Sequence, residues 1–79
     1  MNDIVFDVEL DVRKLACPLP ILRAKKSLAA MNGGQVLKVI ATDKGSAKDF
    51  PEFCSKTGNE LLSADEQGEE FIFHIRRRS

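Results

Sequence analysis

The sequence predicts a two-layer α/β sandwich, in which a four-stranded mixed sheet carries two helices on one face. Four segments have the residue pattern of strands and two have the pattern of amphipathic helices, in the order β-α-β-α-β-β. Each predicted helix has a single apolar stripe, so it needs to pack against only one layer. Right-handed crossovers then place both helices on the same side of the sheet. A chain of 79 residues forms one small domain, which we assign to residues 1–79.

The first strand is predicted from a two-residue alternation near the N-terminus. Ile4, Phe6, Val8 and Leu10 alternate with Val5, Asp7, Glu9 and Asp11. Successive side chains of a strand point to opposite faces, so this pattern indicates a strand with one buried face.

The first helix is predicted to begin at a pair of prolines, Pro18 and Pro20. Proline is tolerated in the first turn of a helix, where backbone N–H groups have no partner, and is costly further in. An apolar stripe with helical spacing follows, and the run 32–34 (Asn-Gly-Gly) is expected to end the helix with a left-handed glycine cap. The stripe consists of Ile21, Ala24, Leu28 and Met31.

The second strand and second helix follow directly. Residues 36–42 are apolar except at Lys38, which suits a central strand with a parallel neighbour. After the polar turn 43–46, the run 49–52 (Asp-Phe-Pro-Glu) resembles a capping box, with Asp49 as the N-cap and Pro51 in the first turn. An earlier start near Ser46 is the alternative. Gly58 is expected to stop this helix, whose inner face consists of Phe50, Phe53, Cys54 and Thr57.

The last two strands are predicted at residues 60–64 and 71–76, joined around Gln67 and Gly68 as an antiparallel hairpin. In the final strand Phe71, Phe73 and Ile75 share one face, and His74 points to the other.

Composition excludes several classes of function. Twelve basic and twelve acidic residues balance, so the chain has no overall attraction for nucleic acid or an anionic membrane. Two cysteines and one histidine are too few for a structural zinc site, and no organic cofactor is implied. No segment has the character of a signal peptide, so we expect a cytoplasmic protein without a permanent disulfide. We also expect a monomer.

Cys17 is the candidate reactive residue. A thiol at a helix N-terminus is expected to have a lowered pKa and more of the reactive thiolate. The amides of Leu19 and Ile21 are the expected local donors to the sulfur, and nearby basic residues, Arg13, Lys14 and Arg23, would add positive potential. The alternative is that Cys17 is a small apolar residue and that the prolines only start a helix. No base is placed beside it, since the sequence does not bring His74 near, so a hydrolytic enzyme is not expected.

The segment 10–20 (Leu-Asp-Val-Arg-Lys-Leu-Ala-Cys-Pro-Leu-Pro) resembles the signature of the TusA (SirA-like) sulfur carrier family. Further resemblance at matching spacing covers nearly the whole chain, in residues 33–37, 41–43, 49–54, 60–61 and 73–76. The resemblance implies the same β-α-β-α-β-β sandwich. Many members have glycine where this chain has Lys14, and many members of the tRNA branch have a basic residue at Ala16 and an acidic one at Leu19.

By this resemblance, Cys17 accepts a sulfane sulfur as a persulfide from a cysteine desulfurase or another sulfurtransferase. It then passes the sulfur to a relay acceptor protein, so the chain is not an enzyme in the turnover sense. Delivery toward 2-thiouridine in tRNA is implied, or toward another pathway such as sulfur oxidation, molybdenum cofactor synthesis or selenium metabolism. The rival hypothesis is a redox or regulatory interaction module that carries no sulfur.

The remaining candidates have supporting roles. The turn of Pro18, Leu19 and Pro20 is expected to present the thiol, and Asp11 is expected to accept hydrogen bonds from backbone N–H groups of the adjacent turn. Cys54 is expected to pack in the core, rather than act as a resolving thiol, and residues 76–78 to form a solvated basic end. The partner-docking surface is predicted from four basic residues near the thiol: Arg13, Lys14, Arg23 and Lys26.

Overall fold

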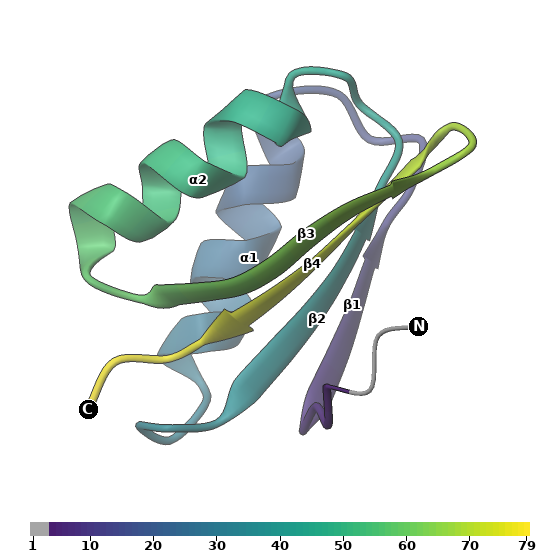
Figure 1. The fold of residues 1–79 in the computed structure, drawn as a ribbon. Coiled ribbons are helices and arrows are strands. Elements are labelled where there is room, and N and C mark those ends of the chain that lie inside the picture. The colour runs from purple at the N-terminus through teal and green to yellow at the C-terminus, as the bar shows by residue number, and fades with distance from the viewer. Residues whose placement is uncertain (1–3) are drawn as a thin grey trace.

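The computed structural model describes residues 4–79 and contains four strands and two helices in the predicted order (Figure 1). The elements are β1 (Val8–Val12), α1 (Leu19–Ala29), β2 (Val36–Ala41), α2 (Ser46–Thr57), β3 (Glu60–Gln67) and β4 (Glu70–Arg76).

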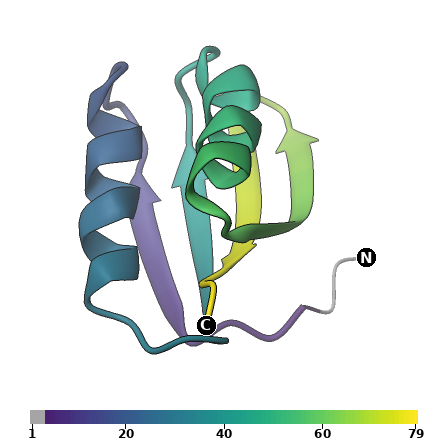
Figure 2. The ribbon, with the colours of Figure 1, turned by 90° about the vertical axis from the view of Figure 1, so that its left-hand side faces the viewer.

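The strands form one mixed sheet in the order β1-β2-β4-β3. β1 pairs with β2 in parallel, while β4 pairs with both β2 and β3 in antiparallel fashion. Figure 2 shows both helices on the same face of this sheet. The predicted two-layer architecture is therefore confirmed, including the central position of β2 and the hairpin that turns at Gly68.

The core lies between the sheet and the helices. Side chains of the sheet and of both helices meet there, and Phe50 of α2 stacks on Phe73 of β4 with ring centroids 4.7 Å apart. The fully buried positions on β4, Phe73 and Ile75, belong to the face that the alternation predicts. The buried cluster consists of Val12, Ala24, Leu28, Met31, Leu37, Val39, Ala41, Phe50, Cys54, Phe73 and Ile75.

The two helices run in the same direction across the sheet (Figures 1 and 2). Their N-terminal ends therefore lie at one end of the helical layer, and their C-terminal ends lie at the other, where the chain also ends. α1 follows β1 and α2 follows β2, and these two strands are parallel to each other. The parallel direction of the helices is therefore a direct result of the crossover topology.

The first strand begins later than the alternation predicts. Residues 4–7 lie outside β1, because Asp7 pairs with Val36 through both its N–H and its side chain. The Asp7 carboxylate accepts the Val36 N–H at 2.8 Å, which replaces a regular ladder contact. Phe6 then crosses to the outer face of the sheet, where its ring centroid lies 6.2 Å from that of His74.

The end of α1 also differs from the prediction. The helix ends at Ala29 with Ala30 as its cap in a right-handed conformation, so no glycine caps it. Gly34 instead adopts a φ of 88° in the turn before β2. At Gly33, an added Cβ would lie 2.9 Å from the Cα of Ser79, so the close approach of the C-terminal segment requires the absence of a side chain.

The predicted capping box of α2 is wrong, and the alternative start near Ser46 is confirmed. Gly45 is the N-cap, and Asp49 is the fourth residue of the helix, with its N–H donating to the Gly45 carbonyl at 2.9 Å. Pro51 therefore lies inside the helix. The predicted stop is confirmed, since Gly58 has a φ of 81° and donates its N–H to the Cys54 carbonyl.

Candidate functional site

Cys17 is exposed in the turn between β1 and α1. Pro18 is the N-cap of α1, and the Leu22 N–H donates to the Pro18 carbonyl at 3.1 Å, which closes the first helical turn. Pro20, the second residue of α1, is buried. The prolines therefore hold the thiol at the helix start, as the sequence predicts.

The amide of Leu19 does not face the sulfur. Its N–H donates to the Ala16 carbonyl at 2.9 Å, within the turn that precedes the helix. The prediction that Leu19 is a donor to a charged sulfur is therefore wrong, because the turn itself uses that donor.

Acidic side chains of the second crossover lie near the thiol. Cys17 and Pro18 line a groove of about 270 Å³ together with Asp49, Glu52 and Phe53 of α2. Asp43 and Asp49 converge beside Gly45, where an added Cβ would lie 3.0 Å from the Oδ2 of Asp43 and 3.5 Å from that of Asp49. The aligned N-terminal ends of the helices bring these carboxylates to Cys17.

The expected lowering of the Cys17 pKa is wrong. The pKa of this thiol lies above its ordinary value, first because the Asp49 carboxylate accepts a hydrogen bond from it. Partial desolvation and the negative charges of Asp49 and Asp43 act in the same direction. The carboxylates that raise this pKa are far away from Cys17 in the sequence.

The basic residues before the helix form a separate group. Arg13 donates to Asp11 at 2.9 Å and to Glu70 at 3.1 Å, so two carboxylates already neutralise its charge. Arg13, Lys14 and Arg23 line one groove of about 690 Å³, and Cys17 does not belong to its lining. Lys26 is exposed further along α1, outside this groove. The structure thus brings three of the four predicted docking residues together.

Asp11 has the predicted role in the turn. Its Oδ1 accepts the backbone N–H of Arg13 at 3.0 Å. Hydrogen bonds from the Arg13 side chain, followed by that backbone bond, lower the pKa of Asp11 to about 2. The carboxylate therefore stays ionised and organises the turn that leads to the thiol.

Lys14 adopts the left-handed conformation, with a φ of 67°. Its N–H donates to the Thr42 hydroxyl at 2.8 Å, which ties this turn to the end of β2. Glycine takes this conformation without steric cost, and a residue with a side chain does not. The position of Lys14 is therefore one at which the backbone itself favours glycine.

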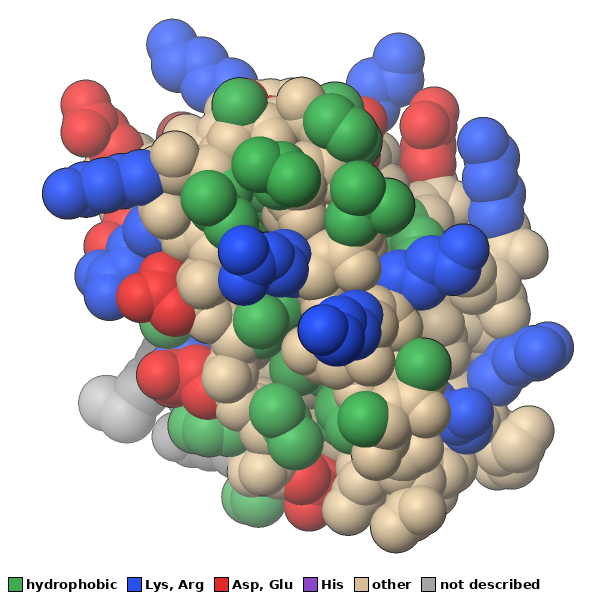
Figure 3. Space-filling view, turned by 180° about the vertical axis from the view of Figure 1, so that it is seen from behind, with side chains coloured by type: hydrophobic (Ala, Val, Ile, Leu, Met, Phe, Trp, Pro, Cys, Tyr) green, Lys and Arg blue, Asp and Glu red, His purple; other side chains and the backbone are tan. Residues whose placement is uncertain are grey.

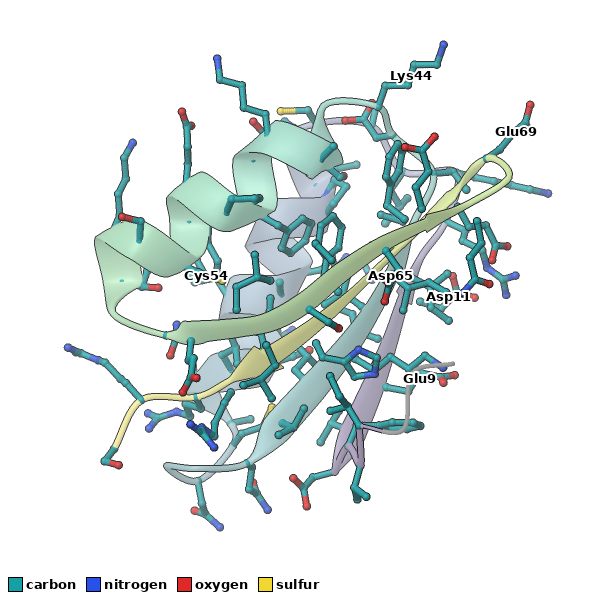
Figure 4. The ribbon with its side chains drawn as sticks, in the orientation of Figure 1. Glu9, Asp11, Lys44, Cys54, Asp65 and Glu69 are labelled. Carbon is teal, nitrogen blue, oxygen red and sulfur yellow. The ribbon has the colours of Figure 1, made fainter. Side chains whose placement is uncertain are left out.

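Cys54 lies in the core, as predicted. Its side chain is 3% exposed and points into the space between α2 and the sheet (Figure 4). Burial raises its pKa to about 11, so the thiol is not reactive near neutral pH.

His74 lies on the face of the sheet away from the helices, as predicted, but it is buried there because Phe6 covers that face. Its Nδ1 lies 2.9 Å from the Ser63 hydroxyl. The structure keeps it apart from the groove of Cys17, whose lining it does not join.

Sequence reasoning missed the exposed apolar side chains that flank the thiol. Leu19 and Leu22 are 44% and 53% exposed on α1. Figure 3, seen from the side of α1 and β1, shows hydrophobic side chains interspersed with Lys and Arg on this face. Both leucines fall outside the apolar stripe of the helix, so the sequence pattern could have shown that their side chains would be exposed.

Two further observations concern residues 4–79 as a whole. Within residues 4–79, no three side chains of His, Cys, Asp or Glu are grouped in a way that could hold a metal ion. None of the helices between residues 4 and 79 has the length and apolar character needed to cross a membrane.

Comparison with known proteins agrees with this geometry. The family described as Sulfurtransferase TusA matches residues 8–77. The chain is 61% identical over 72 residues to the sulfur carrier protein TusA of Allochromatium vinosum, covering 91% of this chain and 95% of the relative. It is 54% identical over 69 residues to a putative sulfur carrier protein of Neisseria meningitidis, covering 87% and 93%.

A solved structure has the same fold. The SirA-like protein of Desulfitobacterium hafniense superimposes with a TM-score of 0.81 at 23% identity, covering 92% of this chain and all of that protein. The family match over residues 8–77 includes the thiol turn, both helices and all four strands. The chain therefore belongs to the TusA family.

Proposed function

We propose that this protein is a sulfur carrier that holds sulfane sulfur as a persulfide on Cys17. The observation that carries the proposal is an exposed thiol, held by two prolines at the start of α1, in a chain of the TusA family. The relatives from Allochromatium and Neisseria are named as sulfur carriers or putative sulfur carriers.

The proposed loading step moves one sulfur atom without net oxidation. The Cys17 thiolate attacks the outer sulfur of a persulfide on the donor protein. A new S–S bond forms to Cys17, the donor S–S bond breaks, and its electron pair leaves on the donor thiolate. The Cys17 proton passes to Asp49, which lines the same groove, and then to the donor thiolate.

The raised thiol pKa suits a carrier that waits for its partner. An ordinary thiol with a pKa of about 8.5 is roughly 3% ionised at pH 7, and Cys17 is ionised less than that. The resting protein therefore resists indiscriminate alkylation and oxidation, which also require the thiolate. Reaction occurs when a docked partner is present and Asp49 takes the proton.

We further propose that partners dock on the basic and apolar surface around the thiol turn. A cysteine desulfurase or another sulfurtransferase would be the donor, and a relay protein would be the acceptor. Arg13, Lys14, Arg23 and Lys26 are the predicted polar contacts, and Leu22 adds exposed apolar area beside them. Delivery toward 2-thiouridine in tRNA, or toward another sulfur-trafficking pathway, would take place in the cytoplasm.

Mass spectrometry tests the carrier function. The protein is incubated with a cysteine desulfurase and free cysteine, and we expect a gain of one sulfur atom on the peptide that contains Cys17. A reductant should remove it. The variant Cys17→Ser should gain no sulfur, and Cys54→Ser should gain as much as the unmodified chain. If no adduct forms, or if the adduct persists in Cys17→Ser, the proposal is wrong.

A further inference from the structure

The backbone of the C-terminal residues Arg77 and Arg78 is hydrogen-bonded to the rest of the fold. The Arg77 N–H donates to the Gln35 carbonyl, and its own carbonyl accepts the Gly34 N–H, both at 2.8 Å. The Arg78 N–H donates to the Asn59 side chain at 2.9 Å. The expected solvated basic end is therefore tied to the fold through its backbone, while Arg76 and Arg78 stay exposed and Arg77 is half-buried.

These arginines join two lysines around one pocket between the C-terminal halves of the helices. Lys25 of α1 and Lys56 of α2 line it with Arg77 and Arg78, in a volume of about 300 Å³. The Arg77 guanidinium donates to the Leu28 carbonyl at 2.7 Å, and the Arg78 side chain lies over Gly58. We call the space lined by Lys25, Lys56, Arg77 and Arg78 the basic pocket.

The basic pocket has no carboxylate of its own. No aspartate or glutamate belongs to its lining. Within residues 4–79, the four ion pairs of the structure involve Arg13, Lys38 and Arg76, and none of the pocket's four cations. In a chain with equal numbers of acidic and basic residues, this concentration of unneutralised charge is suited to an anionic ligand.

The basic pocket continues into the groove that contains the thiol. Phe53 and Lys56 line both, so an apolar ring and a lysine stem connect them. The thiol end carries Asp49 and Glu52, whereas the other end carries only cations. A ligand with carboxylates at one end is therefore oriented, because its charge is attracted to the basic pocket and repelled from the thiol end.

The spacing indicates the size of the ligand. Lys25 follows Leu19, the first residue of α1, by six residues, which is about 9 Å along the helix axis. An extended peptide spans this distance in about three residues. A partner segment that places a cysteine at Cys17 would thus bring side chains three to four residues away into the basic pocket.

We infer that the groove between the two helices binds an extended acidic segment of a sulfur-donor or sulfur-acceptor protein, with its reactive cysteine at Cys17 and its carboxylates in the basic pocket. This inference rests on the proposed carrier function. It adds that the partner segment is acidic and that its carboxylates lie at the end of the groove away from Cys17.

Disulfide exchange with short peptides tests the inference without any partner protein. Cys17 is first converted to a mixed disulfide with thionitrobenzoate, and mass spectrometry verifies that Cys54 stays unlabelled. A peptide thiolate then attacks the Cys17 sulfur, the existing S–S bond breaks, and the coloured aryl thiolate leaves with the electron pair. Its absorbance gives the rate constant.

We compare peptides of the form Cys-Gly-Ser-Gly-Glu-Glu-Glu with counterparts in which glutamine replaces glutamate. At low salt we expect the acidic peptide to react about five to ten times faster. The preference should fall to about one at high salt, and also when the glutamates directly follow the cysteine. Equal rates for the acidic and neutral peptides would overturn the inference.

Charge removal identifies the site. The double variant Lys25→Gln/Lys56→Gln should lose most of the preference, since both lysines are exposed and their removal leaves the core intact. Lys48→Gln is the matched control, because Lys48 is an exposed lysine of α2 outside both linings. A preference that survives the double variant, or that Lys48→Gln removes equally, would contradict the assignment.

Two further results separate this inference from its alternatives. If a short RNA or polyphosphate protects Cys17 and the acidic peptide shows no preference, the pocket binds phosphate chains and the inference is wrong. Sulfur loading of Cys17 by a desulfurase is measured independently. Loading without a peptide preference would reject only the acidic segment, whereas a peptide preference without loading would reject the carrier function.

Discussion

Replacement of Phe50 by alanine tests how α2 is attached to the sheet. Phe50 is 0% exposed, and its ring stacks on Phe73 at 4.7 Å between centroids with an interplanar angle of 23°. It also follows Asp49, the carboxylate that shares a groove with Cys17 and raises the pKa of its thiol. Loss of this ring would therefore weaken the element that determines the surroundings of Cys17.

The expected loss of stability is large for a domain of this size. A buried phenylalanine replaced by alanine costs about 3–5 kcal/mol, which includes the cavity that is left behind. The stacked pair contributes roughly 0.5–1.5 kcal/mol of this. A domain of 79 residues has a total free energy of unfolding of about 4–12 kcal/mol. The variant should therefore lose about a quarter or more of its stability.

Urea unfolding followed by circular dichroism measures this loss. Phe53→Ala is the matched control, because Phe53 lies on the same helix but is only partly buried and makes an edge contact to Phe50 at 6.5 Å. We expect the control to lose clearly less stability. A cost below about 2 kcal/mol for Phe50→Ala, or an equal cost for the two variants, would refute the assignment of Phe50 as the anchor of α2.

Three further outcomes follow from the titratable groups. Asp49→Asn should speed alkylation of Cys17 by iodoacetamide near neutral pH, because it removes a negative charge that raises the thiol pKa, while Glu52→Gln should change the rate less; an unchanged rate in Asp49→Asn would contradict the proposed contact. In the unmodified chain Cys17 should react much faster than Cys54, whose pKa of about 11 and burial both suppress reaction, and peptide mapping of the alkylated protein would show equal labelling if this were wrong. Burial lowers the pKa of His74 in the folded chain below its ordinary value of 6.5. As the pH falls, the histidine is therefore protonated in the unfolded chain before it is protonated in the folded chain, and the free energy of unfolding should fall below a pH of about 6.5. The fall should be smaller in His74→Gln, and identical pH profiles by chemical unfolding would count against it.

Local patterns predicted the elements well and their first residues less well. The strands at 36–42 and 71–76 and the stop at Gly58 follow from residue types that act on their own neighbours. The capping box at Asp49 is the wrong start for α2, because the sequence pattern places Pro51 in the first turn of the helix. In the structure the backbone hydrogen bonds begin at the Gly45 carbonyl, and Pro51 lies inside the helix. Such a boundary depends on how the crossover meets the sheet.

The candidate thiol was predictable and its electrostatics were not. The two prolines place Cys17 at a helix start in any fold that contains the helix. The electrostatic surroundings of the sulfur are set instead by Asp49, which lies 32 positions later in the sequence. Only the packing of α2 beside α1 brings this carboxylate near Cys17. A helix N-terminus therefore failed to predict the direction of the pKa shift.

The sequence by itself determined the order of elements, the position of the thiol and the burial of Cys54, because hydrophobic periodicity and proline act locally along the chain. Only the tertiary structure decided what surrounds the thiol and what the C-terminal arginines do. Two parallel crossovers align the helices, which gathers carboxylates at Cys17 and cations at the opposite end of the same groove. Charge interactions depend on distance in space, and the fold sets that distance.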